Sequence, residues 1–226
     1  MAGTAIFDMD RTLTRSGTWS RYMFSVNKKR PLFYLRLPLL AVHALAYKLG
    51  LLTRQSVKEH GLKTLKWASR ETLERAAENF AEEEIRHGLR KQTRHVLDQH
   101  RKAGHRLVMA TAAADLVAKP IAKRLGMDIV ISTELAWSEA GRLTGKLAGP
   151  NCYGTAKLDL VHAAHAVHNF QSPTTGYSDH VSDLPLLQWV TQGVAVNPSR
   201  GLALIADKAG LRVEDWEADA MENKTR

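Results

Sequence analysis

Short apolar runs alternate with longer segments of helical periodicity over most of the chain. Three or four consecutive apolar residues fit strands that are covered on both faces of a sheet, whereas apolar residues at every third or fourth position fit helices. Predicted strands are residues 5–7, 107–110, 129–132 and 193–196, and predicted helices are residues 91–103, 112–125, 154–167 and 202–208. Strands that alternate with helices predict an α/β fold with a doubly wound, mostly parallel sheet.

One long stretch interrupts this alternation. Residues 15–90 contain no clear strand pattern and their periodicity is helical. We therefore expect an all-helical cap at 15–90, inserted after the first strand, and an α/β catalytic core made of residues 1–14 and 91–226. A helical insertion at the carboxyl end of a strand lies over the edge where α/β proteins bind ligands, so it can act as a lid.

Residues 32–51 of the expected cap leave two interpretations open. Apolar residues recur there at helical spacing, and Pro38 predicts a kink or a junction between two helices. The segment is either a buried packing face inside the cap or a helix on an anionic membrane, with residues 28–30 as its basic collar. The spaced residues are Leu35, Leu39, Val42, Ala46 and Leu49.

Positive charge is concentrated in the same part of the chain. The formal net charge is +9, and residues 15–70 contain 12 Lys or Arg against one acid, Glu59. A local excess of cations favours an anionic partner, such as a phosphorylated substrate or a membrane surface. The five tryptophans form no stripe interleaved with basic residues that would stack bases, so we expect no nucleic-acid partner.

Cysteine content and apolar runs indicate the compartment. Cys152 is the only cysteine, which excludes an internal disulfide and suits a reducing environment. The first strand follows within a few residues of Met1 without a secretory signal, and no run reaches the roughly 18 apolar residues of a spanning helix. These features predict a cytoplasmic protein, either free or peripheral at the inner face of the membrane.

Acidic, hydroxyl and basic residues follow several predicted strands or begin a predicted helix. Buried carboxylates repel one another unless a cation or a proton offsets their charge. A carboxylate that attacks an anionic ester needs a divalent cation and positive groups around the phosphate, so the set predicts metal-assisted phosphoryl transfer. The residues are Asp8-x-Asp10-x-Thr12, Thr111, Lys157 and Asp179-x-x-x-Asp183.

The residue types suit separate catalytic roles. Asp8 is the candidate nucleophile, because its attack on phosphorus would form an aspartyl-phosphate. Asp10 can protonate the leaving oxygen and later deprotonate the attacking water. Lys157 can offset the charge that develops in the transition state.

Mg²⁺ is the expected cofactor, because carboxylate and carbonyl oxygens are its usual ligands. The side chains of Asp8 and Asp179 and the backbone carbonyl of Asp10 can bind the ion, and Asp183 can orient its waters. Thr111 can donate a hydrogen bond to a phosphate oxygen. The expected substrate-binding residues are Arg11, Thr12, Thr111, Ala112 and His180.

In this order the motifs resemble the haloacid dehalogenase superfamily, and within it the phosphoserine-phosphatase-like subgroup with a helical cap between its first and second motifs. The resemblance implies a Mg²⁺-dependent phosphatase that works through an aspartyl-phosphate, with the roles given above. It is carried by residues 7–14, 108–111, 154–157, 176–187 and 194–198.

Two departures from that subgroup bear on the substrate. Arg11 stands where the family usually has Gly, and it brings a cation near the mouth of the site. Phosphoserine phosphatases use a Glu and an Arg of the cap to hold the amino acid, whereas residues 15–70 contain only Glu59. We expect hydrolysis of a small phosphorylated metabolite or a phospholipid head group. The alternatives are phosphoryl transfer to another acceptor and a non-catalytic protein that binds anionic membranes.

Overall fold

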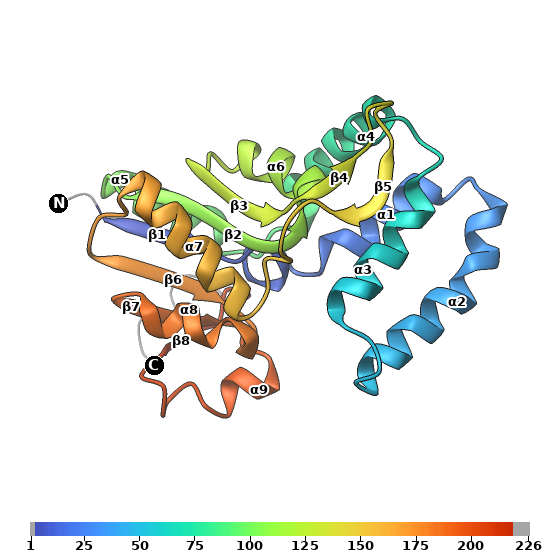
Figure 1. Ribbon diagram of the computed structural model, residues 1–226. Helices are drawn as coiled ribbons and strands as arrows, with labels where there is room; N and C mark the ends of the chain where they lie inside the picture. Colours follow the sequence, from blue (N-terminus) through green and yellow to red (C-terminus); the bar gives the residue numbers. More distant parts are fainter. Residues whose placement is uncertain (1–2, 219–226) are drawn as a thin grey trace.

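A six-stranded parallel sheet forms the centre of the computed structural model, which describes residues 3–218 (Figure 1). The strand order is β3-β2-β1-β6-β7-β8, and each neighbouring pair is parallel. The prediction of a doubly wound α/β fold is confirmed. The strands are β1 (Thr4–Phe7), β2 (Arg106–Ala114), β3 (Ile129–Thr133), β6 (Thr174–Ser178), β7 (Gln192–Val196) and β8 (Arg212–Glu214).

β1 lies at the middle of the sheet and is fully buried. It pairs with β2 on one side and β6 on the other, so its short apolar sequence meets no solvent. The strand order reverses between β1 and β6, and α/β proteins bind ligands in the crevice outside such a point. Asp8 follows β1 and Asp179 follows β6, so both residues lie beside that crevice.

Helices pack on both faces of the sheet. Ala5 and Phe7 share one core cluster with residues of α5 and α6, whereas Ile6 shares another with residues of α7 and α8. This alternation follows from the two-residue period of a strand, which turns neighbouring side chains to opposite faces. The helices are α5 (Thr93–Lys102), α6 (Asp115–Arg124), α7 (Thr155–His168), α8 (Leu184–Trp189) and α9 (Arg200–Ala203).

A helical insert separates β1 from β2, as the sequence predicts; residues 18–83 are called the insert below. An antiparallel hairpin, β4 (Leu135–Trp137) and β5 (Leu143–Leu147), extends from the core and contacts α3 of the insert. The division into domains at residues 14 and 90 stays a prediction, and residues 1–2 and 219–226 of the expected core lie outside the described residues. The insert contains α1 (Thr18–Asn27), α2 (Pro31–Lys48), α3 (Arg54–Leu62), the short turn η2 (Lys63–Leu65) and α4 (Arg70–Glu83).

Three predicted elements differ from the structure. β2 continues through Thr111 to Ala114, so the helix expected from residue 112 begins at Asp115. A run of alanines favours helix by propensity, and pairing with β3 overrides it. The helix expected at residues 202–208 is only α9, and neither β6 nor β8 was among the predicted strands.

The exposure of α2 contradicts the first of its two interpretations, a buried packing face inside the cap. It is a single helix that contains Pro38, and its exposure lets water satisfy the carbonyl that Pro38 leaves without a donor. Of its described side chains only Phe33 is buried, whereas Leu35 and Val42 are exposed. A buried packing face at residues 32–51 is therefore wrong.

Gly193 in β7 has no room for a side chain. A Cβ there would lie 2.4 Å from the backbone oxygen of Leu187 and 2.6 Å from Cδ2 of Leu211. Because a backbone carbonyl cannot rotate away, we expect Gly193→Ala to lower the free energy of unfolding by about 1–3 kcal/mol in urea denaturation. Gly149→Ala, whose Cβ would meet nothing within 4 Å, should leave stability unchanged. An equal loss in both variants would contradict this explanation.

Candidate active site

An ion-paired cluster lies at the carboxyl end of β1. The ammonium nitrogen of Lys157 is 2.8 Å from Oδ1 of Asp8 and 2.6 Å from Oδ2 of Asp183. Gly154, at φ 61°, immediately precedes α7, and the first turn of this helix carries Lys157 to the sheet edge. Lys157 is 2% exposed, and both carboxylates are buried with it. One cation thus joins segments that are far apart in sequence.

Thr12 connects Asp8 to Asp179. Its hydroxyl oxygen lies 3.3 Å from Oδ2 of Asp8 and 3.5 Å from Oδ1 of Asp179, and it accepts the backbone N–H of Asp179 at 3.0 Å. Thr12 is fully buried. These bonds direct its hydroxyl to the two carboxylates, and the substrate contact expected for Thr12 stays a prediction.

The turn after β1 accommodates Arg11 at a position where the family usually has Gly. Its φ is 65°, a left-handed conformation that glycine adopts without steric strain and other residues adopt rarely. Arg90 stabilises the turn, because its Nε and Nη2 donate to the Arg11 carbonyl at 2.8 and 2.6 Å. The exposed Arg11 side chain also lowers the pKa of Asp179, against the larger effect of burial.

Burial shifts the pKa values of the cluster. It raises the pKa of Asp8 to about 7, although Lys157 acts in the opposite direction. It raises the pKa of Asp10 and of Asp179 as well. Burial alone would lower the pKa of Lys157, but Asp183 and Asp8 raise it, so the amine stays charged. The anionic carboxylates therefore need more positive charge than Lys157 supplies.

Asp10 is held by the first residue of the insert. Its Oδ1 accepts hydrogen bonds from the backbone N–H and the hydroxyl of Thr18, both at 2.8 Å. Thr18 begins α1, so the position of this carboxylate depends on how the insert joins the core. Burial raises the pKa of this carboxyl, against the opposing hydrogen bonds of Thr18, and a raised pKa favours the role of proton donor.

Thr111 and Ala112 lie in an irregular part of β2. The pairing of β2 with β3 shifts register between Ala110 and Ala114, and β2 contacts the turn that follows β1. The hydroxyl of Thr111 is buried and accepts the N–H of Ala113 at 3.1 Å. This segment is thus beside the Asp8 turn, and its contact with substrate stays a prediction.

His180 has a local structural role. Its Nδ1 accepts the backbone N–H of Ser182 at 3.2 Å and lies 2.9 Å from the Ser182 hydroxyl. The His180 side chain thereby caps the short turn that contains Asp183. Its own N–H donates to the hydroxyl of Ser178, the group that donates to Asp183 at 2.7 Å. A substrate contact of the half-buried ring stays a prediction.

Lys58 is a buried residue beside the site that sequence reasoning missed. α3 carries it from the insert to the core, where its ammonium group donates to the carbonyl of Ala112, to Oδ1 of Asn151 and, at 3.2 Å, to the hydroxyl of Thr133. It is close enough to lower the pKa of Asp10, although burial has the larger effect. Its place depends on how α3 packs against the core, so no sequence signal distinguished it from the other basic residues.

The oxygen donors fit a magnesium ion that keeps part of its water shell. Among residues 3–218, no three His, Cys, Asp or Glu side chains form a ready metal-binding set. Asp183 is held by Lys157 and Ser178, which leaves the Asp8 and Asp179 carboxylates. Mg²⁺ usually takes one or two protein carboxylates and retains several waters. Burial disfavours the charged forms of the Asp8 and Asp179 carboxylates, and a bound cation would stabilise those charged forms.

Comparisons with known proteins agree with these motifs. Phosphoserine phosphatase SerB1 of Mycobacterium tuberculosis is 33% identical over 125 residues, which cover 55% of this chain and 40% of that protein. Histidinol-phosphatase of Neisseria meningitidis is 26% identical over 232 residues, which cover 96% of this chain and 100% of that protein. A solved structure of a protein with unknown function from Bordetella pertussis has a TM-score of 0.84 at 30% identity, covering 96% of this chain and 99% of that one.

The match to the family model is longer than the match to the mycobacterial relative. This chain spans only 40% of the length of that relative. The model described as haloacid dehalogenase-like hydrolase matches residues 5–188, from β1 into α8, and so includes Asp8, Lys157 and Asp183. The resemblance predicted from the motifs is confirmed. The chain belongs to the family of haloacid dehalogenase-like hydrolases.

Proposed function

We propose that this chain is a Mg²⁺-dependent phosphomonoesterase that acts through an aspartyl-phosphate on Asp8. The observation that carries the proposal is the buried cluster of Asp8, Lys157 and Asp183 outside β1, where a sheet of this order binds its ligand. Relatives named phosphoserine phosphatase and histidinol-phosphatase support a phosphate ester as the substrate.

In the first step, an oxygen of Asp8 attacks phosphorus. The bond between phosphorus and the ester oxygen breaks, and Asp10 gives its proton to that oxygen, so the alcohol leaves neutral. Burial raises the pKa of Asp10, which is the direction that favours a proton donor. A bound Mg²⁺ would offset the negative charges of the phosphate and of the carboxylates.

In the second step, water attacks the phosphorus of the aspartyl-phosphate. Asp10, now a carboxylate, takes the proton of this water, and the bond between phosphorus and Asp8 breaks. The products are inorganic phosphate and the original Asp8 carboxylate. Lys157 holds Asp8 and Asp183 in place throughout, and its charge favours the more anionic transition state.

The charges of residues 15–70 favour a substrate without a free ammonium group. Glu59 is the only acid of residues 15–70, and its carboxylate pairs with Lys146 at 2.8 Å. Lys58 adds a cation on the side of the core. We infer that the substrate is a small phosphorylated metabolite or a phospholipid head group whose remaining part is neutral or anionic.

Replacement of the nucleophile tests the proposal directly. We expect Asp8→Asn to lower phosphate release by at least about 10³-fold, because an amide oxygen is a poor nucleophile. The assay is release of inorganic phosphate with Mg²⁺ from a panel of sugar, nucleotide, amino-acid and lipid monophosphates. Asp98→Asn on the exposed side of α5 is the matched control. Full activity of the Asp8 variant, with unchanged thermal unfolding, would reject the mechanism.

Metal removal gives a second test, with one measurement of activity and one of stability that needs no substrate. We expect EDTA to abolish hydrolysis and Mg²⁺ to restore it. Mg²⁺ should also raise the melting temperature of the wild type, since a ligand that binds only the folded state stabilises it. The increase should be smaller for Asp179→Asn. The same increase in both proteins would remove Asp179 from the ion site.

The role of Lys58 can be measured by kinetics. We expect Lys58→Gln to lower kcat/KM by about 10- to 100-fold, the effect of losing a buried charged donor. Arg75→Gln, an exposed cation of α4, should leave kcat/KM unchanged. An unaltered kcat/KM for Lys58→Gln would show that the residue joins insert and core without serving the reaction.

A further inference from the structure

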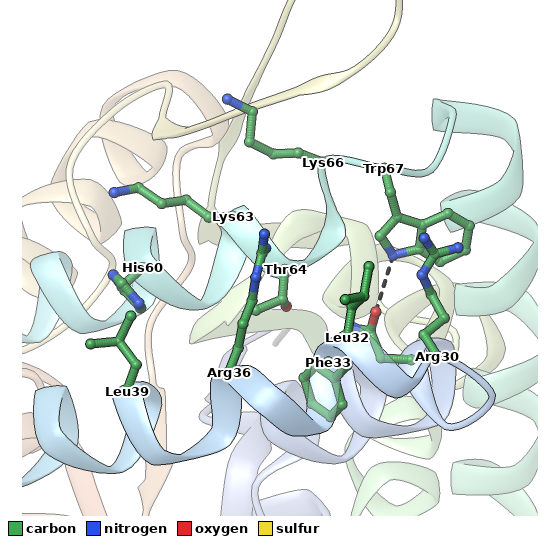
Figure 2. A pocket seen from close by; sticks show the side chains of 11 residues that line it. Arg30, Leu32, Phe33, Arg36, Leu39, His60, Lys63, Thr64, Lys66 and Trp67 are labelled. Carbon is green, nitrogen blue, oxygen red and sulfur yellow. Dashed lines mark hydrogen bonds between the residues drawn. The ribbon is translucent and has the colours of Figure 1, made fainter.

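A basic pocket lies within the insert, between α2 and the segment formed by α3 and η2 (Figure 2). Its volume is about 660 Å³. Arg36 extends into it from α2, with Lys63 and Lys66 on the opposite side, and Arg30 lies against Trp67 at one end. We call this the basic pocket. Four cations around one cavity indicate an anionic ligand.

The described residues leave these cations without counter-charges. Arg36, Lys63 and Lys66 form no ion pair among residues 3–218. The guanidinium of Arg30 stacks 3.8 Å from the ring centre of Trp67, a contact that does not neutralise it. The ring of His60 lines the same pocket, and its pKa is lowered by burial and then by His43, Lys63 and Arg36. The pocket is therefore a region of positive potential.

An exposed apolar stripe runs along α2 next to this pocket. Its members are spaced by seven, three and four residues, so they share one side of the helix. Their side chains are 57% to 76% exposed, whereas leucine and valine side chains in a row on one side of a helix are usually buried. Leu32 and Leu39 line the pocket and are one helical turn from Leu35, so stripe and pocket adjoin. The α2 stripe consists of Leu35, Val42, Leu45 and Leu49.

We propose that the α2 stripe and the basic pocket dock this protein on an anionic lipid bilayer. The helix lies in the interface with its stripe toward the acyl chains, and phosphates of the head groups occupy the pocket. The two surfaces match the two layers of one membrane leaflet, and the charge of the pocket is opposite to that of anionic lipids. None of the described helices has the length and apolarity that a spanning segment requires.

Charge argues against a second copy of the chain as the occupant. A symmetric contact through the stripe would bring the same cations of both copies together, because a two-fold interface pairs each patch with itself. Residues 11–58 contain no Asp or Glu that could offset these positive charges. An anionic bilayer removes this repulsion and covers the stripe at the same time.

The docking surface is separate from the candidate active site. α3 lies between α2 and the core (Figure 1), and its Lys58 contacts core residues while its His60 lines the basic pocket. The inference goes beyond the proposed hydrolysis and does not depend on it. Variants of the docking surface therefore leave the catalytic groups in place.

Flotation with lipid vesicles tests the docking. The wild type should bind phosphatidylcholine vesicles that contain about 30 mol% phosphatidylglycerol, bind pure phosphatidylcholine weakly, and lose binding as salt is added. We expect Arg36→Gln with Lys63→Gln to weaken binding about 25-fold, or fivefold for each charge. Leu35→Ser with Val42→Ser should also weaken it, because the inserted apolar area is lost.

Matched pairs of exposed residues on the core are the controls. Lys102→Gln with Lys123→Gln removes the same charge, and Val167→Ser with Leu204→Ser removes exposed apolar side chains, which are 77% and 72% exposed. Both controls should bind like the wild type. Equal losses in controls and docking variants, equal binding to neutral and anionic vesicles, or no binding would overturn the proposal.

Two further measurements separate the other outcomes. Light scattering would reveal a dimer, and a dimer that Leu35→Ser with Val42→Ser splits, without vesicle binding, would assign the stripe to a second copy and overturn the proposal. Hydrolysis of p-nitrophenyl phosphate is measured in parallel. Docking variants that keep this hydrolysis and lose vesicle binding support the proposal. A wild type that binds anionic vesicles without hydrolysing any ester would count against the phosphatase alone.

Discussion

The double ion pair of Lys157 is the interaction on which the rest of the site depends. An ammonium group buried to this degree is unstable alone, and Asp8 and Asp183 on two sides of it restore the balance. Asp8 follows β1, Asp183 lies in the turn between β6 and α8, and Lys157 lies in α7, so the pair forms only when the sheet is assembled. Removal of one member of a buried pair typically destabilises a protein by about 3–5 kcal/mol. Folding and chemistry therefore rely on the same side chains.

The sequence was sufficient for those parts of the site that follow from strand order. Asp8 follows a predicted apolar strand, and parallel strands bring their carboxyl ends to one edge, so its place beside the crevice was predictable. Asp179 was grouped with it by its chemistry and motif, because the strand before it, β6, has no apolar run that marks it in the sequence. The hydroxyl of Thr12 was assigned to substrate because a linear motif does not show which neighbour a side chain faces. Lys58 and Thr18 were missed because the packing of the insert, which no local pattern encodes, sets their positions.

The insert has two sides with different chemical character. Toward the core it supplies Thr18, which donates to the Asp10 carboxylate, and Lys58, which donates to the hydroxyl of Thr133. Away from the core, α2 exposes apolar side chains beside cations without counter-charges. Helical spacing alone could not distinguish the buried face from the exposed one, because both repeat every three or four residues. α3 connects the two sides, so a rotation of this helix would move both Lys58, which contacts the core, and His60, which lines the basic pocket.

The central position of β1 has a consequence for biosynthesis. Thr4 pairs with Arg106 on one side and Thr174 on the other, so β1 is translated well before both of its partners. Contacts between distant segments slow folding, and an unpaired apolar strand is a target for aggregation. β1 has only four residues and is followed at once by carboxylates and hydroxyls. Charged and polar residues that flank an apolar strand disfavour its aggregation, so we expect the candidate catalytic residues also to protect the unpaired β1.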